Sequence, residues 1–352
     1  MNMLVRYIML LLSLASISTV AVSTKDQWSW TYKKCFKPSE VGLDKKDCMF
    51  AQINVPHFNQ LIFSWNSLRP IKGYFTFSGQ TRDAKTKKWG PWYKMSEWGA
   101  DVARSFIQKG TNGSGFFHVR LETGTALADA FRIKVETKDG ALSSSLKSIN
   151  VCTANFEKFK SEPVTQELFQ LPSIKVAGVP RISQYELAHP HSDRICSPTS
   201  CAMLTSYLLG TLIDAHTFAQ GAFDHGLGKY GSWPFNIAHA FDVCQGNILF
   251  AVTRLDSFKN LHQLLAKKLP VVVSVRGPLE GAPGAYAQGH LLLVIGWDAQ
   301  TQRVICHDPA HALHEQTESY YKIESFLTAW ERSRRLAYIA QPIKQTMTCA
   351  KK

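Results

Sequence analysis

The segment from Arg194 to Leu209 constrains the fold of this chain more than any other stretch. Pro198 lies where a helix is expected to begin, because its fixed φ suits a first turn and its missing N–H is not needed there. Apolar residues follow at helical spacing, and Gly210 ends the pattern. The segment therefore predicts a buried helix with Cys196 at its N-terminus, where unpaired N–H groups and the helix dipole favour a thiolate.

A thiolate at this position can act as a nucleophile, although a structural or disulfide-bonded cysteine is the alternative for a single residue. A nucleophilic cysteine also needs a base and a group that orients the base. Two apolar runs joined by turn residues, 289–298 and 304–310, predict a β-hairpin. If the hairpin is centred near Ala299, His290 faces Asp308 with Cβ atoms about 5 Å apart, and a slip of one residue would separate them.

An oxyanion donor and a metal site are the two other kinds of site to consider. Gln184 lies upstream of Cys196, and its amide could join the Cys196 backbone N–H in holding an oxyanion; an ordinary surface glutamine is the alternative. The segments 189–193 and 306–311 contain residue types that bind metals. We expect the first to be a surface loop and the second to direct His307 away from Cys306 and Asp308, so we expect neither metal nor cofactor.

The chain divides into two parts that differ in their predicted secondary structure. Residues 24–155 contain aromatic-rich strand candidates separated by turns, such as the alternating run 131–136, and predict a β-sandwich. Residues 156–178 are typical of a connector, residues 179–345 alternate helices and strands as an α+β domain, and residues 346–352 form a tail. In the second domain we expect helices at 213–220, 237–243, 257–268 and 326–332, and strands at 249–253, 271–275, 290–297, 302–307 and 336–340. Trp89, Trp92 and Trp98 are expected to pack within the sandwich, with an aromatic platform for sugar or peptide as the alternative.

The N-terminus predicts export. Residues 1–23 combine an early Arg6, an apolar core and small residues before an expected cleavage site, which is typical of a signal peptide. A retained membrane anchor is the alternative. We therefore expect a periplasmic or secreted protein, with no stable membrane insertion after cleavage. Export permits disulfides among the eight cysteines, of which Cys35 and Cys48 form the most local pair, but the connectivity stays open.

The net charge of +13 favours anionic partners. The basic residues are nevertheless dispersed, and the densest group is Lys85, Lys87 and Lys88. We expect no nucleic-acid partner, because a nucleic-acid-binding domain usually concentrates its basic residues in one patch.

The order of several motifs resembles one family. Gln184, the Cys196 helix, Gly289-His290 opening a strand, and Asp308-Pro309-Ala310 closing the next follow the order of the papain clan. The pattern is similar to exported peptidases related to the bacteriocin-leader processing peptidases, and it extends from about 176 to 342. Further segments that carry it are 230–236, 269–275, Tyr320-Tyr321 and Trp330, with Ser64-Trp65-Asn66 and Trp89-Gly90-Pro91-Trp92 in the first domain.

This resemblance implies a papain-like cysteine peptidase domain, with Cys196 as nucleophile, His290 as base, Asp308 as the orienting residue and Gln184 as the oxyanion amide. Its substrate would be a peptide or protein, including cell-envelope peptide. Ser197 departs from the glycine that commonly follows the nucleophile, and its side chain is expected to narrow the site. Two other functions stay open, an acyl-transferring transpeptidase and an envelope-binding protein with an inert peptidase fold.

Overall fold

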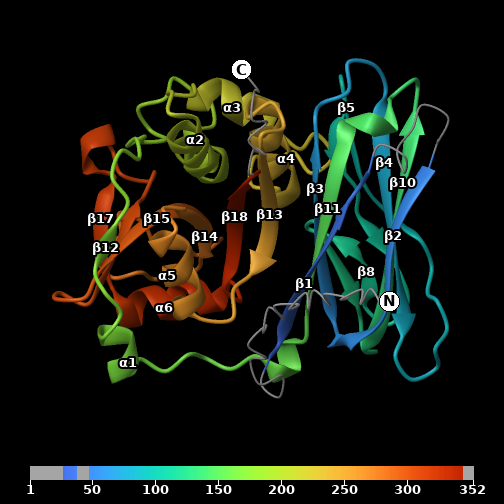
Figure 1. Cartoon of the computed structure of the whole chain (residues 1–352), viewed down its shortest axis with the longest axis horizontal. Helices are drawn as coiled ribbons and strands as arrows, with labels where there is room; N and C mark the ends of the chain where they lie inside the picture. Colours follow the sequence, from blue (N-terminus) through green and yellow to red (C-terminus); the bar gives the residue numbers. More distant parts are fainter. Residues whose placement is uncertain (1–26, 38–46, 344–352) are drawn as a thin grey trace, which may run out of the picture.

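The computed structural model describes residues 27–37 and 47–343, which form an N-terminal β region and a C-terminal α/β region side by side (Figure 1). The expected signal peptide, the tail from 346 and Cys349 lie outside the described residues. In the described part of the chain, no helix has the length and apolarity that a membrane crossing requires.

The N-terminal region consists of two antiparallel sheets, with strand orders β1-β11-β3-β9-β8-β7 and β2-β10-β4-β5-β6. The strands are β1 (Ser29–Cys35), β2 (Asp47–Phe58), β3 (Gln60–Ser67), β4 (Tyr74–Asp83), β5 (Tyr93–Gly99), β6 (Ala103–Ser105), β7 (Gln108–Lys109), β8 (Ser114–Phe117), β9 (Arg120–Thr123), β10 (Ala128–Lys138) and β11 (Leu146–Ala154). Aromatic side chains connect the two sheets. Trp65 of β3 stacks on Phe77 of β4 with ring centroids 4.5 Å apart. The two sheets therefore share one buried core.

The tryptophans of this region have different environments. Trp98 is completely buried under the Arg69 guanidinium, 3.8 Å from its ring centroid. Trp89 is covered in the same way by Arg132 at 3.7 Å, whereas Trp92 is exposed. The packing expectation is confirmed for Trp98 and wrong for Trp92, whose side chain is 38% exposed.

The C-terminal region is built on a seven-stranded sheet ordered β13-β18-β14-β15-β16-β17, with β12 pairing to β15. Its strands are β12 (Ile174–Lys175), β13 (Ile248–Arg254), β14 (Val271–Val275), β15 (His290–Asp298), β16 (Arg303–His307), β17 (Glu318–Lys322) and β18 (Leu336–Pro342). The helices are α1 (Gln166–Phe169), α2 (Cys196–Leu209), α3 (Ala215–Gly221), α4 (Trp233–Val243), α5 (Phe258–Ala266) and α6 (Ile323–Arg332). Short 3₁₀ turns lie at Ser143–Ser145, Phe156–Lys158, Ser192–Arg194 and His314–Gln316. Every residue of β14 is buried, as expected of a strand covered on both faces.

Most expected elements form, and two differences have clear causes. The helix expected from residue 237 begins at Trp233, because Pro234 fits the first helical turn after Ser232. Strand β17 was not expected, since its alternation of buried and exposed residues spans only five positions. It pairs with all five residues of β16 as the edge strand of the sheet.

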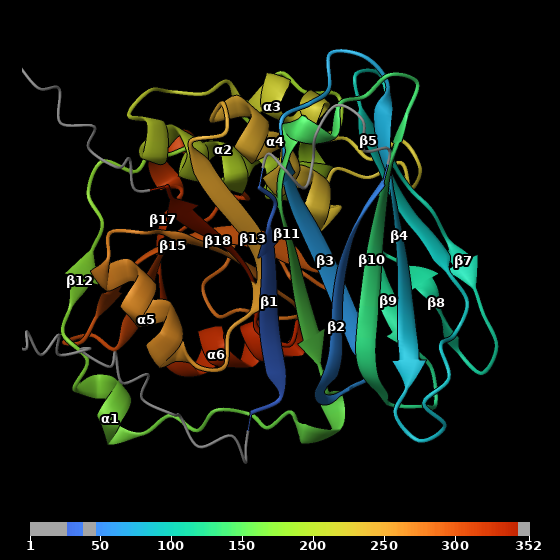
Figure 2. The ribbon, with the colours of Figure 1, turned by 45° about the vertical axis from the view of Figure 1, so that its right-hand side comes forward.

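Polar side chains of the β region form hydrogen bonds with backbone groups of β13, the strand at the edge of the C-terminal sheet. Asn66 donates from Nδ2 to the Phe250 carbonyl at 2.8 Å and accepts from the Phe250 N–H at 2.8 Å. The Val252 N–H donates to Ser64 Oγ at 3.2 Å. Strand β13 therefore lies against β1, β3 and β11 (Figure 2), with backbone groups of Phe250 and Val252 hydrogen bonded across the contact, which fixes the two regions relative to each other.

Seven cysteines are described, and they form no disulfide with one another. Cys35 pairs with Ser148 on one sheet, whereas Cys48 pairs with Val135 on the other. The local pairing considered from the sequence is therefore absent from the described residues.

Candidate active site

Helix α2 presents Cys196 at its first residue and ends at Gly210, whose φ of 68° is the left-handed conformation that glycine adopts readily. Pro198 lies within its first turn, as predicted. The Thr199 hydroxyl donates to the Ile195 carbonyl at 2.7 Å and tightens this turn. The half-buried sulfur consequently lies at the end of a helix that is otherwise buried.

Strand β15 supplies the imidazole. His290 is its first residue, and Gly289 before it has a φ of 94°, which a residue with a side chain rarely adopts. Ser200 of α2 donates from Oγ to the Leu291 carbonyl at 3.1 Å, which ties the helix to the strand one residue after His290. The imidazole is buried and lies close enough to the Cys196 sulfur for the charges of the two groups to shift each other's pKa.

Asp308 follows β16 and is completely buried. Its Oδ1 accepts from His290 Nε2 at 2.7 Å and from the Ala310 N–H at 3.0 Å. Its Oδ2 accepts from the hydroxyls of Tyr286 and Tyr321, each at 2.7 Å. The carboxylate is therefore fully hydrogen bonded and held in one orientation, with Nδ1 left as the His290 nitrogen that faces the sulfur.

The hairpin between β15 and β16 is confirmed, but the predicted register is wrong. Leu293 faces His307, so Asp308 comes opposite position 292 and not opposite His290. The turn is centred beyond Ala299, because Asp298 faces Arg303, and this moves the register by three positions; the bulge between Val294 and Gly296 takes one of them back. The shift amounts to two residues, which keeps His290 and Asp308 on the same face as diagonal neighbours. Their side chains meet for this reason.

The charges of the three groups support one another. Burial alone would raise the pKa of the Cys196 thiol, but the nearby charge of His290 lowers that pKa below its ordinary value. Burial would lower the pKa of His290, yet the charges of Asp308 and Cys196 raise it to about 10. Burial opposes ionisation of Asp308, but His290 and the two tyrosines bring its pKa to about 2. The arrangement favours a thiolate beside an imidazolium at neutral pH.

Tyr286 is the functional residue that sequence reasoning missed. It lies in the loop between β14 and β15 with a φ of 49°, and its ring stacks on the His290 imidazole with centroids 4.1 Å apart and planes 11° apart. It therefore shields the pair formed by His290 and Asp308 from solvent while donating to Asp308. No short motif marks it, because its loop lacks periodicity.

Two substitutions of Tyr286 distinguish the shielding of His290 by its ring from the hydrogen bond of its hydroxyl to Asp308. We expect Tyr286→Ala to move the pKa of His290 down toward its ordinary value near 6.5, because water weakens the attraction to Asp308. The alkaline limb of activity against pH should then shift to lower pH. Tyr286→Phe keeps the ring and should shift this limb much less, with a drop of roughly tenfold in kcat/KM from the lost hydroxyl. Equal pH profiles for the two variants would contradict the shielding role.

Gln184 and Ser197 have positions that the sequence did not determine. Gln184 is buried, and its backbone N–H donates to the Pro309 carbonyl at 2.9 Å, so it lies next to the Asp308 turn. Its Oε1 has no hydrogen-bond partner, and no hydrogen bond joins Gln184 to Cys196 in the described part of the chain. The Ser197 hydroxyl is buried 3.1 Å from the Tyr338 hydroxyl. It does not line the cleft beside Cys196, so the expectation that it narrows the site is wrong.

The remaining histidine segments do not converge on a site. His189 is buried against Tyr230 at 5.1 Å between ring centroids, which corrects the expectation of an exposed loop, whereas His191 is exposed. His307 hydrogen bonds through Nδ1 to the Pro180 carbonyl at 2.9 Å, away from Asp308 as predicted. Among residues 27–37 and 47–343, no group of three or more His, Cys, Asp or Glu is placed to hold a metal ion.

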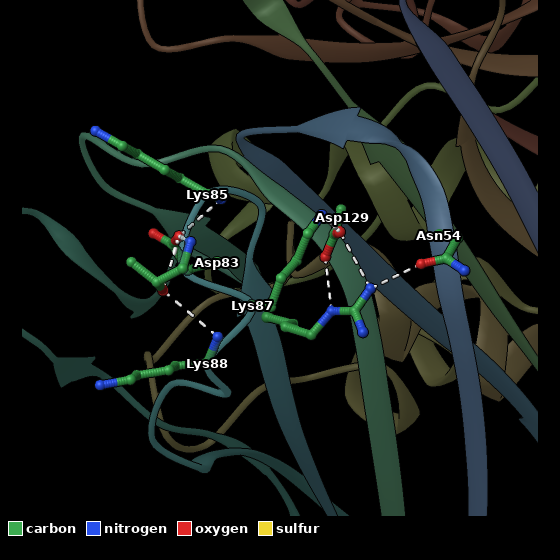
Figure 3. A network of polar contacts seen from close by, with 8 residues as sticks. Asn54, Asp83, Lys85, Lys87, Lys88 and Asp129 are labelled. Atoms are coloured by element: carbon green, nitrogen blue, oxygen red, sulfur yellow. Dashed lines mark hydrogen bonds and ion pairs between the residues drawn. The ribbon is translucent and has the colours of Figure 1, made fainter.

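The densest lysine cluster is part of a structural network (Figure 3). Lys87 reaches the buried Asp129 carboxylate at 2.6 Å, and Arg82 binds the same carboxylate at 2.8 Å. Asp83 accepts from the backbone N–H of Lys85 at 2.9 Å and shapes the turn. The Lys87 ammonium therefore serves an internal ion pair, while Lys85 is exposed.

Comparison with known proteins finds a family match in the C-terminal region. Residues 176–338 match the family model described as the Peptidase_C39 like family. A solved C39-like peptidase from Bacillus anthracis is 19% identical with a TM-score of 0.39, and the match covers 49% of this chain and 100% of that chain. Xylellain, a cysteine protease from Xylella fastidiosa, is 12% identical with a TM-score of 0.35, covering 55% and 94% of the two chains. No curated protein matches the sequence.

Proposed function

Residues 176–338 form a domain of the Peptidase_C39 like family and the chain is a papain-like cysteine peptidase, and from this premise we propose that Cys196 is its nucleophile. His290 acts as base and then as acid, and Asp308 orients the imidazole. The observation that supports the proposal is the buried His290, which is hydrogen bonded to Asp308 at 2.7 Å and lies close enough to the Cys196 sulfur for its charge to lower the pKa of the thiol. Peptide or protein is the substrate class of the family.

The proposed reaction is amide hydrolysis through an acyl-enzyme. The thiolate sulfur attacks the carbonyl carbon of the scissile amide, and the carbonyl oxygen becomes an oxyanion. The imidazolium of His290 gives its proton to the leaving amine as the carbon–nitrogen bond breaks. His290 then takes a proton from water, whose oxygen attacks the thioester and releases the acid and the thiolate.

Two groups are proposed to stabilise the oxyanion. The backbone N–H of Cys196 lies in the first turn of α2, where it has no intrahelical acceptor. Gln184 would provide the second donor through the N–H groups of its Nε2, and its buried position next to the Asp308 turn supports this assignment. Product formation by Gln184→Glu should therefore be much slower than by the native chain.

We further propose the organisation and location of the whole protein. Two antiparallel sheets with a shared aromatic core support a β-sandwich domain over 24–155. A connector at 156–178 leads to the peptidase domain at 179–345. The apolar N-terminal run supports export to the periplasm or medium after cleavage near residue 23.

The rate of alkylation against pH tests the proposed nucleophile. We expect Cys196 to react with iodoacetamide at neutral pH far faster than a free thiol of pKa about 8.5, because it is already a thiolate there. Peptide mapping separates it from the exposed Cys35. In His290→Ala the neutral rate should fall toward that of Cys35. A Cys196 rate that matches Cys35 in the native chain would overturn the proposed pair.

A transpeptidase reaction is the second candidate, since an acyl-enzyme can also transfer to an amine. Product analysis by mass spectrometry with and without an added amine distinguishes the two. Hydrolysis predicts the free acid under both conditions, whereas transfer predicts an amide that appears only with the amine.

A further inference from the structure

The Cys196 sulfur lies in a cleft of about 610 Å³ that both regions of the chain line. The β region contributes Gln60, His118 and Arg120, and the C-terminal region contributes Cys196 and Trp233. This volume lies in the range of ligand pockets. The cleft is therefore large enough to hold part of a substrate against the nucleophile.

Basic side chains dominate the wall of this cleft. Seven lysine and arginine residues line it; one of them, Arg254, is buried, and the other six are Arg120, Arg194, Lys229, Arg276, Arg332 and Arg334. The one carboxylate among the described lining residues is Asp193, which lies 3.7 Å from Arg194. Of the six basic groups, only Arg120 and Arg194 have a described carboxylate within 4.0 Å. The cleft consequently has a large excess of positive charge.

The contacts of these groups leave the charge available to a ligand. Arg276 donates from Nε to the Ala287 carbonyl at 3.3 Å, and Arg332 donates to carbonyls of the same segment. Neutral carbonyls do not cancel a guanidinium charge. Burial lowers the pKa of His118, and the nearby charges of Lys229 and Arg120 lower it further. Low-dielectric walls concentrate such a field inside a cleft.

A strained turn places the β region in this cleft. His118 and Val119 connect β8 to β9 with φ values of 50° and 57°. A buried β-branched residue is rarely found in this left-handed conformation, and such outliers gather at functional sites. The turn brings His118 and Arg120 to the cleft wall, opposite the elements that hold Cys196.

We propose that this cleft binds an acidic segment of the peptide substrate, with Arg120 of the β region and Lys229, Arg276 and Arg332 of the peptidase domain recognising its carboxylates. The inference rests on the proposed function, because it assigns the substrate class of the same site. Only an occupant with an acyl carbonyl can use the sulfur that lines the cleft. An acidic peptide therefore fits the site better than an anionic polysaccharide or a nucleic acid.

Binding by the full chain carrying Cys196→Ala tests the proposal without turnover. Three fluorescein-labelled peptide pools share a randomised core and differ in flanks of Glu, Gln or Lys. Fluorescence anisotropy at low salt should show the Glu pool binding roughly tenfold or more tighter than the Gln pool, and the Lys pool weakest. This preference should shrink as salt is added.

Charge-reversed variants locate the binding. Lys229→Glu combined with Arg276→Glu should abolish the preference for the Glu pool. Lys85→Glu combined with Lys88→Glu changes the net charge equally on the exposed turn of Figure 3, and should leave the preference intact. Loss of the preference in both double variants would mean that overall charge, and not the cleft, attracts the peptide, which overturns the proposal.

Hydrolysis by the native chain separates the two proposals. Equal binding and equal cleavage of the Glu and Gln pools would overturn the acidic-segment proposal while the peptidase function stands. Tight, cleft-dependent binding of the Glu pool with no cleavage of any pool would instead contradict the peptidase function. A heparin fragment or an oligodeoxynucleotide of equal charge that binds the cleft more tightly than the Glu pool would also overturn the assignment to peptide.

Discussion

Cys196→Ala should abolish peptide hydrolysis, with a fall in kcat on the order of 10⁴-fold or more, because no other group can form the acyl-enzyme. The loss should appear in kcat and not in peptide affinity, since alanine leaves the cleft in place. Steady-state hydrolysis and anisotropy binding measured on the same preparation give both quantities.

The matched control for this variant is Cys201→Ala on the same helix. Cys201 is buried, and burial raises the pKa of its thiol, so it is expected to be chemically inert. Cys201→Ala should therefore retain turnover. Comparable activity losses in the two variants would indicate damage to helix α2 and would contradict a specific role for the Cys196 sulfur.

Asp308→Asn should reduce kcat/KM by roughly 10²–10⁴-fold and move the alkaline limb of activity to lower pH. Asp308 supplies the negative charge that raises the pKa of His290 to about 10. Without this charge the pKa of His290 falls, so the imidazolium loses its proton at a lower pH. The amide keeps nearly the same shape, which limits the change to charge and hydrogen bonding.

Asp298→Asn provides the comparison at the other end of the same hairpin. Asp298 accepts from Thr301 in the exposed turn, so its neutralisation should leave the activity profile unchanged. The profile is measured from pH 5 to 11 with one substrate at low concentration. An unshifted alkaline limb in Asp308→Asn would contradict the charge coupling between Asp308 and His290.

The sequence predicted the helix of Cys196 well because its signals are local. Pro198, the apolar spacing and Gly210 each act within a few residues, and the helix ends where they indicate. The strand positions of β13, β14 and β15 were also predicted closely, because their apolar runs are continuous.

The meeting of His290 with Asp308 was predicted from an incorrect register. Spacing determines which face of the strand a side chain occupies. A register shift of two residues does not change that face, so His290 and Asp308 still lie on the same side of the sheet. The bulge near Ile295 depends on packing against other strands, which spacing does not reveal. The contact was therefore predictable, but its geometry was not.

Other parts of the site depend on tertiary packing alone. Tyr286 reaches His290 from an irregular loop, and the turn at His118 reaches the cleft from the other region of the chain. Neither has a pattern within its own segment. Tyr286 is only four positions from His290, but nothing in its loop shows where the ring points, and His118 lies in a different region of the chain from Cys196. Such contacts require the folded chain to be recognised.

The most direct test is titration of the far-ultraviolet thiolate absorbance of the native chain, Cys196→Ala and His290→Ala. The account predicts one thiolate in the native chain that persists well below the ordinary cysteine pKa of about 8.5 and is missing from both variants at neutral pH. A native chain whose absorbance at neutral pH equals that of Cys196→Ala would contradict the thiolate–imidazolium pair.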